Sequence, residues 1–281
     1  MSHDLTVADY AMAGAVSLTL FLAYNANGRE IPTYDSQPTK FAARELLLRR
    51  TLSLNYVVGG TPQFLERAGF QLALDGRYRS AYSPVPAVAA AILLWPFSRV
   101  GLIDLRDPRT PSLISALASS MMVALAMGLT FLTARRRLAT GGAVALVAAL
   151  GLGTGLWSTA SQTLWQHETA ILGLTLAVYG LCALRPRIEE DASVSGDGMR
   201  RLALGVLIGV GLGLAAGSRQ QLAPAVIVLG AAAIALGGRR CGLAAAGAGA
   251  ALLVPVWLAN LRWFGSILGA APMLEALHET V

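Results

Sequence analysis

The chain has 281 residues, of which 55% are hydrophobic and 14% are charged, and its mean hydropathy is +0.57. A soluble domain carries about 25% charged residues, so this composition excludes an ordinary soluble protein. The net charge of +6 comes mainly from arginines in short clusters between apolar runs. Such clusters are typical of membrane-topology signals and do not indicate nucleic-acid binding.

Apolar runs of about 18 or more residues recur along the chain, and each is long enough to cross about 30 Å of hydrocarbon as a helix. The N-terminal run has neither a basic region before it nor a cleavage site, so we expect a retained helix and not a removed signal peptide. The sequence therefore predicts an all-α fold, a polytopic membrane helix bundle of about seven transmembrane helices. The predicted crossings are residues 8–24, 112–134, 139–157, 169–184, 202–217, 222–236 and 242–259.

Arginine clusters set the expected orientation of these crossings. Short loops at residues 135–137, 185–201 and 239–240 are basic, so the positive-inside rule places them in the cytoplasm. The connecting turns on the other side, and a large first loop over residues 25–111, then lie outside. Residues 185–201 are also rich in polar and acidic residues with Ser and Gly, which predicts a flexible cytoplasmic linker.

The apolar piece at residues 85–100 needs a separate interpretation. It is short, and Pro84, Pro86 and Pro96 interrupt it. The arginine pattern is consistent only if this piece does not cross the membrane, so we expect a re-entrant or surface helix buried against protein. The alternative has eight crossings and places Arg135–Arg137 outside.

Small residues and cysteines add two further expectations. Glycines recur every fourth position at Gly205, Gly209, Gly213 and Gly217, which predicts one helix face that a neighbouring backbone can approach closely. The two cysteines, Cys182 and Cys241, have neither the spacing nor the neighbours of a metal site, and we expect both to be reduced.

The first outer loop holds the strongest candidate for catalysis. Asp35 follows the first predicted crossing by about ten residues and should lie near the membrane surface, where carboxylates are ionised at neutral pH. From Lys40 through Arg44 and beyond, the loop predicts a basic amphipathic helix suited to the headgroup region. Asp35 could instead serve only to cap this helix.

Two further outer turns carry polar candidates. One contains Trp165, His167 and Glu168, and the other contains Arg219. Ionisable residues at the edge of a membrane bundle are functional candidates by default. Each also has a structural interpretation: Trp165 as an interfacial anchor, His167 and Glu168 as helix caps, and Arg219 as a snorkelling helix end.

These segments together resemble the GT-C superfamily of polyprenyl-phosphate-sugar-dependent glycosyltransferases. The resemblance lies in the stretch from Tyr34 to residue 39 (Tyr-Asp-Ser-Gln-Pro-Thr), the stretch from Tyr78 to Pro86, the Gln-His-Glu at residues 166–168, and residues 260–266. It implies that residues 1–281 form a single membrane-embedded module with Asp35 as general base. It also implies a location in the bacterial cytoplasmic membrane, with the active side facing outward.

The family chemistry assigns roles to the remaining candidates. The donor would be a polyprenyl-phosphate-linked sugar and the acceptor a hydroxyl group of a glycan or lipid, in contact with membrane lipids. Arg219 is the candidate for gripping the leaving phosphate, with Lys40 and Arg44 as competitors, because a planar guanidinium matches phosphate oxygens. The candidates for binding the sugar or a divalent cation are His167 and Glu168; Tyr34 and Tyr82 complete the expected substrate-binding set.

The chain also departs from the family pattern. The second outer motif is His167-Glu168 where members have an aspartate, which leaves metal use open, and the usual adjacent prolines are spaced as Pro84 and Pro86. The chain ends at Val281, so we expect either the seven-helix catalytic module alone or a shortened product. A transporter or lipid flippase and a non-catalytic assembly subunit remain the alternative functions.

Overall fold

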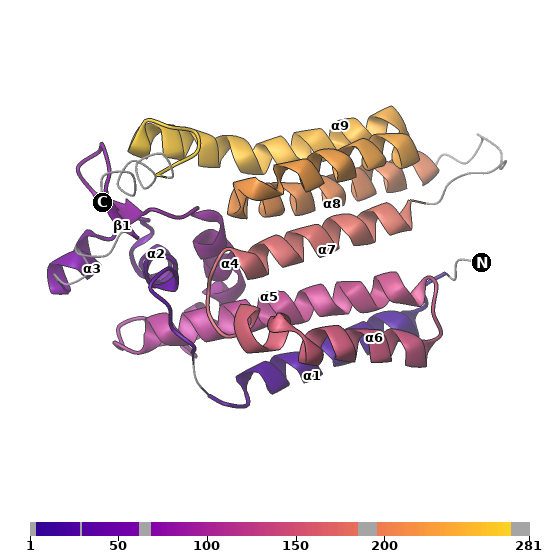
Figure 1. Ribbon diagram of the computed structural model, residues 1–281, viewed down its shortest axis with the longest axis horizontal. Coiled ribbons are helices and arrows are strands. Elements are labelled where there is room, and N and C mark those ends of the chain that lie inside the picture. The colour runs from indigo at the N-terminus through magenta and orange to yellow at the C-terminus, as the bar shows by residue number, and fades with distance from the viewer. Residues whose placement is uncertain (1–3, 29, 62–68, 185–195, 271–281) are drawn as a thin grey trace. The chain divides into compact units, whose positions relative to one another are not determined.

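The computed structural model describes residues 4–28, 30–61, 69–184 and 196–270, and these are mostly helical (Figure 1). The chain forms two compact units. Unit 1 comprises residues 1–23, 123–156 and 170–253, and unit 2 comprises residues 24–122, 157–169 and 254–281. Most of the predicted linker at residues 185–201 and Arg29 lie outside the described residues.

The elements, in chain order, are α1 (Val7–Asn25), α2 (Ser36–Arg49), α3 (Asn55–Gly60), β1 (Phe70–Leu72), β2 (Tyr78–Ser80), α4 (Val85–Arg99), α5 (Thr110–Arg135), α6 (Thr140–Gly153), the π-helix η2 (Leu156–Ala160), α7 (His167–Ala183), α8 (Gly196–Ser218), the 3₁₀ helix η3 (Gln220–Leu222) and α9 (Ala223–Phe264).

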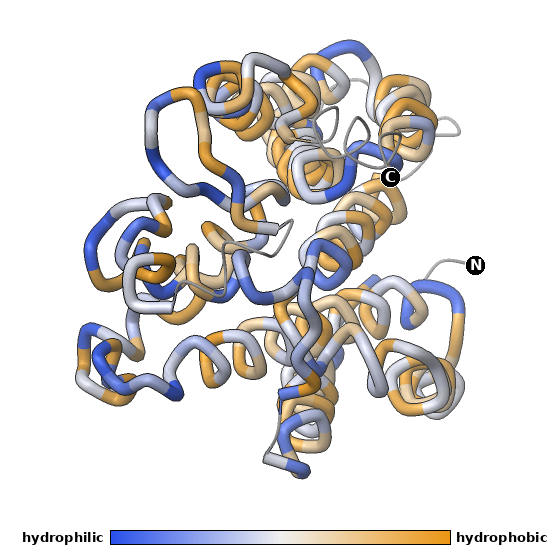
Figure 2. Tube along the Cα trace, turned by 60° about the vertical axis from the view of Figure 1, so that its left-hand side comes forward, coloured by the Kyte–Doolittle hydropathy of each residue, from blue (hydrophilic) through white to orange (hydrophobic). Residues whose placement is uncertain are grey.

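Among the described residues, four helices are long and apolar enough to cross a membrane, namely Val7–Asn25, Thr110–Arg135, Gly198–Ser218 and Gln220–Phe264. Shorter apolar helices are α4, α6 and α7. Hydrophobic residues run along these helices, and hydrophilic ones concentrate in the connections (Figure 2). The prediction of a helical, membrane-type fold is therefore confirmed, with one small antiparallel sheet, β1–β2, added to it.

The longest helical segment, α9, contains a reversal. Gly238 has φ 78° and ψ 177°, a conformation that only glycine adopts readily. Ile234 packs directly against Gly242, although residues this far apart in a straight helix would be separated by about 12 Å. The chain thus folds back at Gly238, and α9 consists of two helices that meet beside Arg239 and Arg240. These helices coincide with the last two predicted crossings.

The third predicted crossing, residues 139–157, is not one continuous helix. Helix α6 ends at Gly153, and the π-helix η2 follows from Leu156. Gly153 and Gly155 flank Thr154, whose hydroxyl donates to the carbonyl of Leu150 at 2.6 Å. Glycine weakens a helix, and this side-chain hydrogen bond occupies a carbonyl at its end. The apolar run therefore shows that the segment is buried or lipid-facing but does not show where the helix stops.

Glycines set the packing of α7, α8 and α9 in unit 1, which lie side by side in Figure 1. Gly173 of α7 faces Gly211 of α8, and their backbones approach so closely that a Cβ on either would meet the other's carbonyl oxygen. On another face of α8, Gly205 and Gly209 lie against the backbone of α9. The predicted glycine stripe is thus a helix–helix contact of the small-residue type.

This contact predicts different outcomes for glycine substitutions. A methyl group at Gly209 would fall on the carbonyl of Ala245, so Gly209→Ala should lower the free energy of unfolding by about 1–3 kcal/mol. Gly247→Ala is the matched control, since nothing lies within 4 Å of the added Cβ and alanine favours helix. Thermal unfolding of the purified variants measures both effects. Equal stability of the two variants would contradict the packing.

One end of unit 1 gathers polar and basic groups from three helices. Arg135, at the end of α5, pairs with Asp9 at the start of α1, with 2.8 Å between Nε and Oδ1. Arg136 lies over the ring of Tyr179 near the end of α7 at 5.5 Å, and the hydroxyls of Tyr179 and Tyr10 are 3.3 Å apart. The start of α1 therefore meets the ends of α5 and α7.

Two more helices reach the same end of unit 1. Arg200, near the start of α8, donates to the carbonyl of Ala183, the last residue of α7, at 3.0 Å. Arg201 donates to the carbonyl of Gly237 at the α9 reversal at 3.5 Å. The arginine clusters that the sequence treats as topology signals are therefore neighbours at one end of this bundle.

In unit 2, α2 packs against α4, and both bury mainly small side chains at their contact surfaces. Ala43 and Ala90 are completely buried, which lets the two helices approach closely. Helix α4 covers residues 85–99 and packs on α2, while the interpretation of this piece as a re-entrant or surface helix stays a prediction. However, α2 begins at Ser36 and also buries Lys40 and Glu45, so it is not the basic surface helix that the sequence predicts.

A β-hairpin, not predicted from the sequence, follows α3 in unit 2. Strands β1 and β2 pair antiparallel, with Phe70 opposite Ser80. The turn contains Asp75 and Gly76, with φ 72° at the glycine and a hydrogen bond of 3.2 Å from the Arg77 backbone N–H to the Asp75 carboxylate. Asp-Gly is a strong turn former for these reasons.

The hairpin is joined to the end of α9. The backbone N–H of Leu74 donates to the carbonyl of Trp263 at 2.7 Å. Helix α9 stops at Gly265, which has φ 71°. The buried side chain of Asn260 then donates to the carbonyl of Ile267 at 3.1 Å and holds the following loop. Residues 260–266, one of the segments that resemble the GT-C pattern, are thus hydrogen-bonded to the hairpin and to the loop that follows α9.

Candidate functional site

Asp35 occupies the N-cap position of α2 but makes no capping hydrogen bond. The backbone N–H of Ser36 instead donates to the hydroxyl of Thr33 at 3.3 Å. The exposed carboxylate of Asp35 accepts a hydrogen bond of 2.8 Å from the hydroxyl of Tyr82. Helix capping, the structural alternative for Asp35, is therefore not the role that this geometry gives it.

Tyr82 reaches Asp35 from the segment between β2 and α4. Burial, together with the hydrogen bond to Asp35 and the negative charge of Asp35, raises the pKa of Tyr82 well above its usual range. The phenol therefore stays protonated and donates to the carboxylate at all physiological pH values. Tyr34, the other candidate tyrosine, is adjacent to Asp35 in sequence and 73% exposed.

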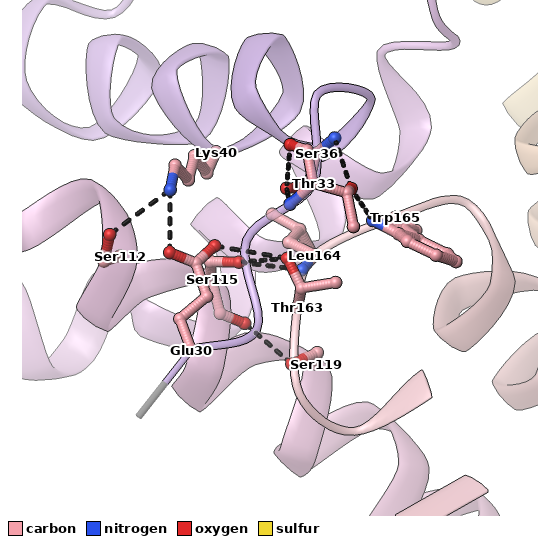
Figure 3. Close-up of polar contacts among 10 residues, drawn as sticks. All are labelled: Glu30, Thr33, Ser36, Lys40, Ser112, Ser115, Ser119, Thr163, Leu164 and Trp165. Carbon is pink, nitrogen blue, oxygen red and sulfur yellow. Dashed lines mark hydrogen bonds and ion pairs between the residues drawn. The ribbon is translucent and has the colours of Figure 1, made fainter. Parts of the chain in front are cut away.

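The turn that contains Trp165 holds the loop that carries Asp35 (Figure 3). The indole N–H of Trp165 donates to the hydroxyl of Thr33 at 2.7 Å, and the backbone N–H of Ile31 donates to the carbonyl of Gln162 at 3.3 Å. Trp165 therefore fixes the approach to Asp35. The interfacial-anchor interpretation of Trp165 does not describe these contacts.

A buried polar network lies beneath this loop (Figure 3). Lys40 pairs with Glu30 at 2.7 Å, and both side chains are about 95% buried, with 4% and 5% exposed. Lys40 also donates to Ser112 at 3.2 Å, and Thr163 donates to Glu30 at 3.2 Å. The network therefore connects the first loop, α5 and the turn that contains Trp165.

Two residues that were predicted to bind phosphate, Lys40 and Arg44, make structural contacts within the protein. Lys40 is held by Glu30, as described. Arg44 donates from Nε to the carbonyl of Leu105 at 2.9 Å and lies 3.4 Å from the carboxylate of Glu45. Because Glu45 is completely buried and also pairs with Arg49 at 2.6 Å, it requires these cations.

His167 and Glu168 start α7. The His167 ring lies 5.3 Å from that of Trp165, between centroids. Glu168 is completely buried, and within the described residues its carboxyl oxygens accept no hydrogen bond of ordinary geometry. Among the described residues, His, Cys, Asp and Glu side chains form no group of three or more that could hold a metal ion. The divalent cation that His167 and Glu168 were predicted to bind stays a prediction.

Arg219 belongs to unit 1. It precedes η3, and its backbone N–H donates to the carbonyl of Ala215 at 2.9 Å, which closes the end of α8. Its predicted role in gripping phosphate is not tested by this geometry and stays a prediction. Both cysteines are free thiols, as expected.

An arginine-rich pocket in unit 2 was not predicted from the sequence. Its volume is about 610 Å³, and it is lined by Asp75, Arg77, Arg79, Leu258, Ala259, Arg262 and Trp263. Arg79 and Trp263 also line a smaller neighbouring pocket, together with Tyr82. The residues come from the hairpin and from the end of α9, far apart in the chain, so no local motif indicates that they meet.

The Asp75 carboxylate holds Arg79, one of the three arginines of this pocket, in place. Burial acts to raise the pKa of Asp75, but the hydrogen bond and charge of Arg79, together with Arg77, outweigh it and lower the pKa. Asp75 therefore stays ionised and pairs with Arg79 at 2.6 Å.

No protein-family model, curated protein or solved structure matches this chain. The functional argument therefore depends on the geometry of the site and on the chemistry of its residues. Within unit 2, a hydrogen bond joins Asp35 and Tyr82, which lie in two of the GT-C-like segments, and the turn that contains Trp165 holds the loop before Asp35.

Proposed function

We propose that the chain is a membrane-embedded glycosyltransferase, which transfers a sugar from a polyprenyl-phosphate donor to an acceptor hydroxyl with Asp35 as general base. The contact between the exposed carboxylate of Asp35 and the Tyr82 hydroxyl carries this proposal. A carboxylate that neither caps a helix nor pairs with a cation among the described residues, but is held by a phenol at a surface, is suited to accept a proton.

The chemistry needs one base. The acceptor hydroxyl attacks the anomeric carbon of the sugar, the bond from that carbon to the phosphate oxygen breaks, and the hydroxyl proton passes to Asp35. Tyr82 occupies Oδ1 of Asp35, which leaves Oδ2 to receive the proton. The polyprenyl phosphate leaves with the bonding electrons, so the developing negative charge requires cations nearby.

We propose further that seven helices cross the bacterial cytoplasmic membrane, with the N-terminus and the arginine end of unit 1 in the cytoplasm. The contacts of Arg135, Arg136, Arg200 and Arg201 at one end of this bundle support that orientation, because positive charge is retained on the cytoplasmic side. In this topology unit 2 contains the extracytoplasmic loops, including Asp35.

Cysteine labelling tests the topology. In a variant that lacks Cys182 and Cys241, new cysteines at the exposed positions Arg137 and Arg239 should be shielded from an impermeant thiol reagent in intact cells. Cysteines at the exposed positions 60 and 221 should react. Labelling at 137 without permeabilisation would favour the eight-crossing alternative. Labelling of every position after permeabilisation is the control.

The function itself is tested by a transfer assay on purified protein with a panel of polyprenyl-phosphate sugars and hydroxyl acceptors. The expected result is transfer from at least one donor, with release of polyprenyl phosphate. If no donor in the panel supports transfer while a proteoliposome assay shows movement of a lipid or solute, the flippase or transporter alternative replaces this proposal.

A further inference from the structure

The hairpin and the end of α9 form a surface with excess positive charge. Arg77, Arg79 and Arg262 line the pocket with a single acidic residue, Asp75. Arg77 and Arg262 are exposed, and within the described residues neither guanidinium makes a hydrogen bond or ion pair. Three arginines with one carboxylate, at one pocket, favour an anionic ligand with several acceptor oxygens.

Arg79 is buried and held in place by its neighbours. It is 7% exposed, its guanidinium stacks 4.3 Å above the ring of Trp263, and Asp75 holds one edge at 2.6 Å. Its Nε is buried and donates to no acceptor in the described part of the chain. A buried N–H without a partner costs free energy, which a ligand oxygen would recover.

We propose that this arginine pocket binds a phosphate group, and that the phosphate is carried by a lipid. Arginine is the preferred side chain for phosphate because its planar fork matches two oxygens. The lipid source follows from the other wall, where Leu258 and Ala259 line the pocket from α9, a helix apolar enough to cross a membrane. A phosphate at this position therefore has apolar surface beside it for the first part of a hydrocarbon chain.

Shared residues connect the pocket to the candidate base, and its role in catalysis rests on the proposed transferase function. Arg79 and Trp263 line both this pocket and its smaller neighbour, which Tyr82 also lines, and Tyr82 contacts Asp35. The anomeric carbon of the donor is bonded directly to a phosphate oxygen. A phosphate in the arginine pocket thus brings the reacting carbon to the side of the site where Asp35 lies.

Binding of farnesyl phosphate to the purified full chain, measured by calorimetry, tests the proposal without requiring turnover. The double variant Arg77→Ala/Arg262→Ala should weaken binding by at least about tenfold, because each arginine loses a charge-assisted hydrogen bond. Arg106→Ala/Arg109→Ala is the matched control, since it removes the same charge from exposed positions outside the pocket and should change affinity less than about twofold. Farnesol, which has the chain without the phosphate, should bind weakly to every variant.

The outcomes separate this inference from the proposed function. Unchanged farnesyl phosphate affinity in the pocket variant, or equal loss in the control, overturns the pocket. Inorganic phosphate that binds as tightly as farnesyl phosphate, and is lost with the same arginines, overturns the lipid source. Farnesyl phosphate binding that depends on Arg77 and Arg262 in a protein that transfers no sugar supports the pocket and refutes the transferase.

Discussion

Asp35→Asn should lower sugar transfer by roughly 10²–10⁴-fold while thermal stability stays close to that of the unchanged protein. Asparagine keeps the shape of aspartate and can still accept the hydrogen bond from Tyr82, but it cannot take up the acceptor's proton. Asp35 makes no capping hydrogen bond and is exposed, so the fold should lose little. Initial transfer rates at saturating donor, with unfolding temperature in parallel, measure the effect.

The matched control for this prediction is Asp107→Asn. Asp107 is also exposed and belongs to the same unit, and its carboxylate accepts a local hydrogen bond from the backbone N–H of Arg109. Near-normal transfer by a well-folded Asp35→Asn protein would end the assignment of the base. Glu168 would be a poor replacement as the base, because its side chain is completely buried.

The helices were predictable because hydrophobicity accumulates over many residues. A run such as 202–217 excludes other structures by its length, and the spacing of Gly205 and Gly209 gives the face on which a neighbour packs. The reversal at Gly238 was also predictable, since Arg239 and Arg240 would be costly within a membrane-spanning helix. The end of α6 at Gly153 was not, because a helix can stop inside an apolar run for local hydrogen-bonding reasons.

The candidate site was only partly predictable. Asp35 and Tyr82 could be selected because each lies in a recognisable segment, but their hydrogen bond depends on the packing of α2 on α4. The arginine pocket could not be predicted, because Arg79 and Trp263 meet only through the hairpin's attachment to α9. A sequence shows where charges are and not which partner each one has.

Lys40 illustrates this limit and leads to the second large expected effect. The sequence gives it as a basic residue on a surface helix that could bind phosphate. The structure places its ammonium group 2.7 Å from the carboxylate of Glu30, with both side chains buried. Lys40→Met should therefore lower the free energy of unfolding by about 3–5 kcal/mol, because it leaves the Glu30 charge buried without its cation.

A second substitution distinguishes the ion pair from a ligand-binding role. Lys40→Met/Glu30→Gln removes both charges, and the glutamine side chain can still accept the hydrogen bond from Thr163, so most of the lost stability should return. Thermal unfolding of both variants gives the comparison, and farnesyl phosphate affinity is measured on the double variant, which should be folded. If Lys40→Met were as stable as the unchanged protein and only donor affinity fell, Lys40 would be a phosphate ligand after all. Recovery of stability in the double variant, with donor affinity retained, assigns Lys40 to holding the loop that carries Asp35.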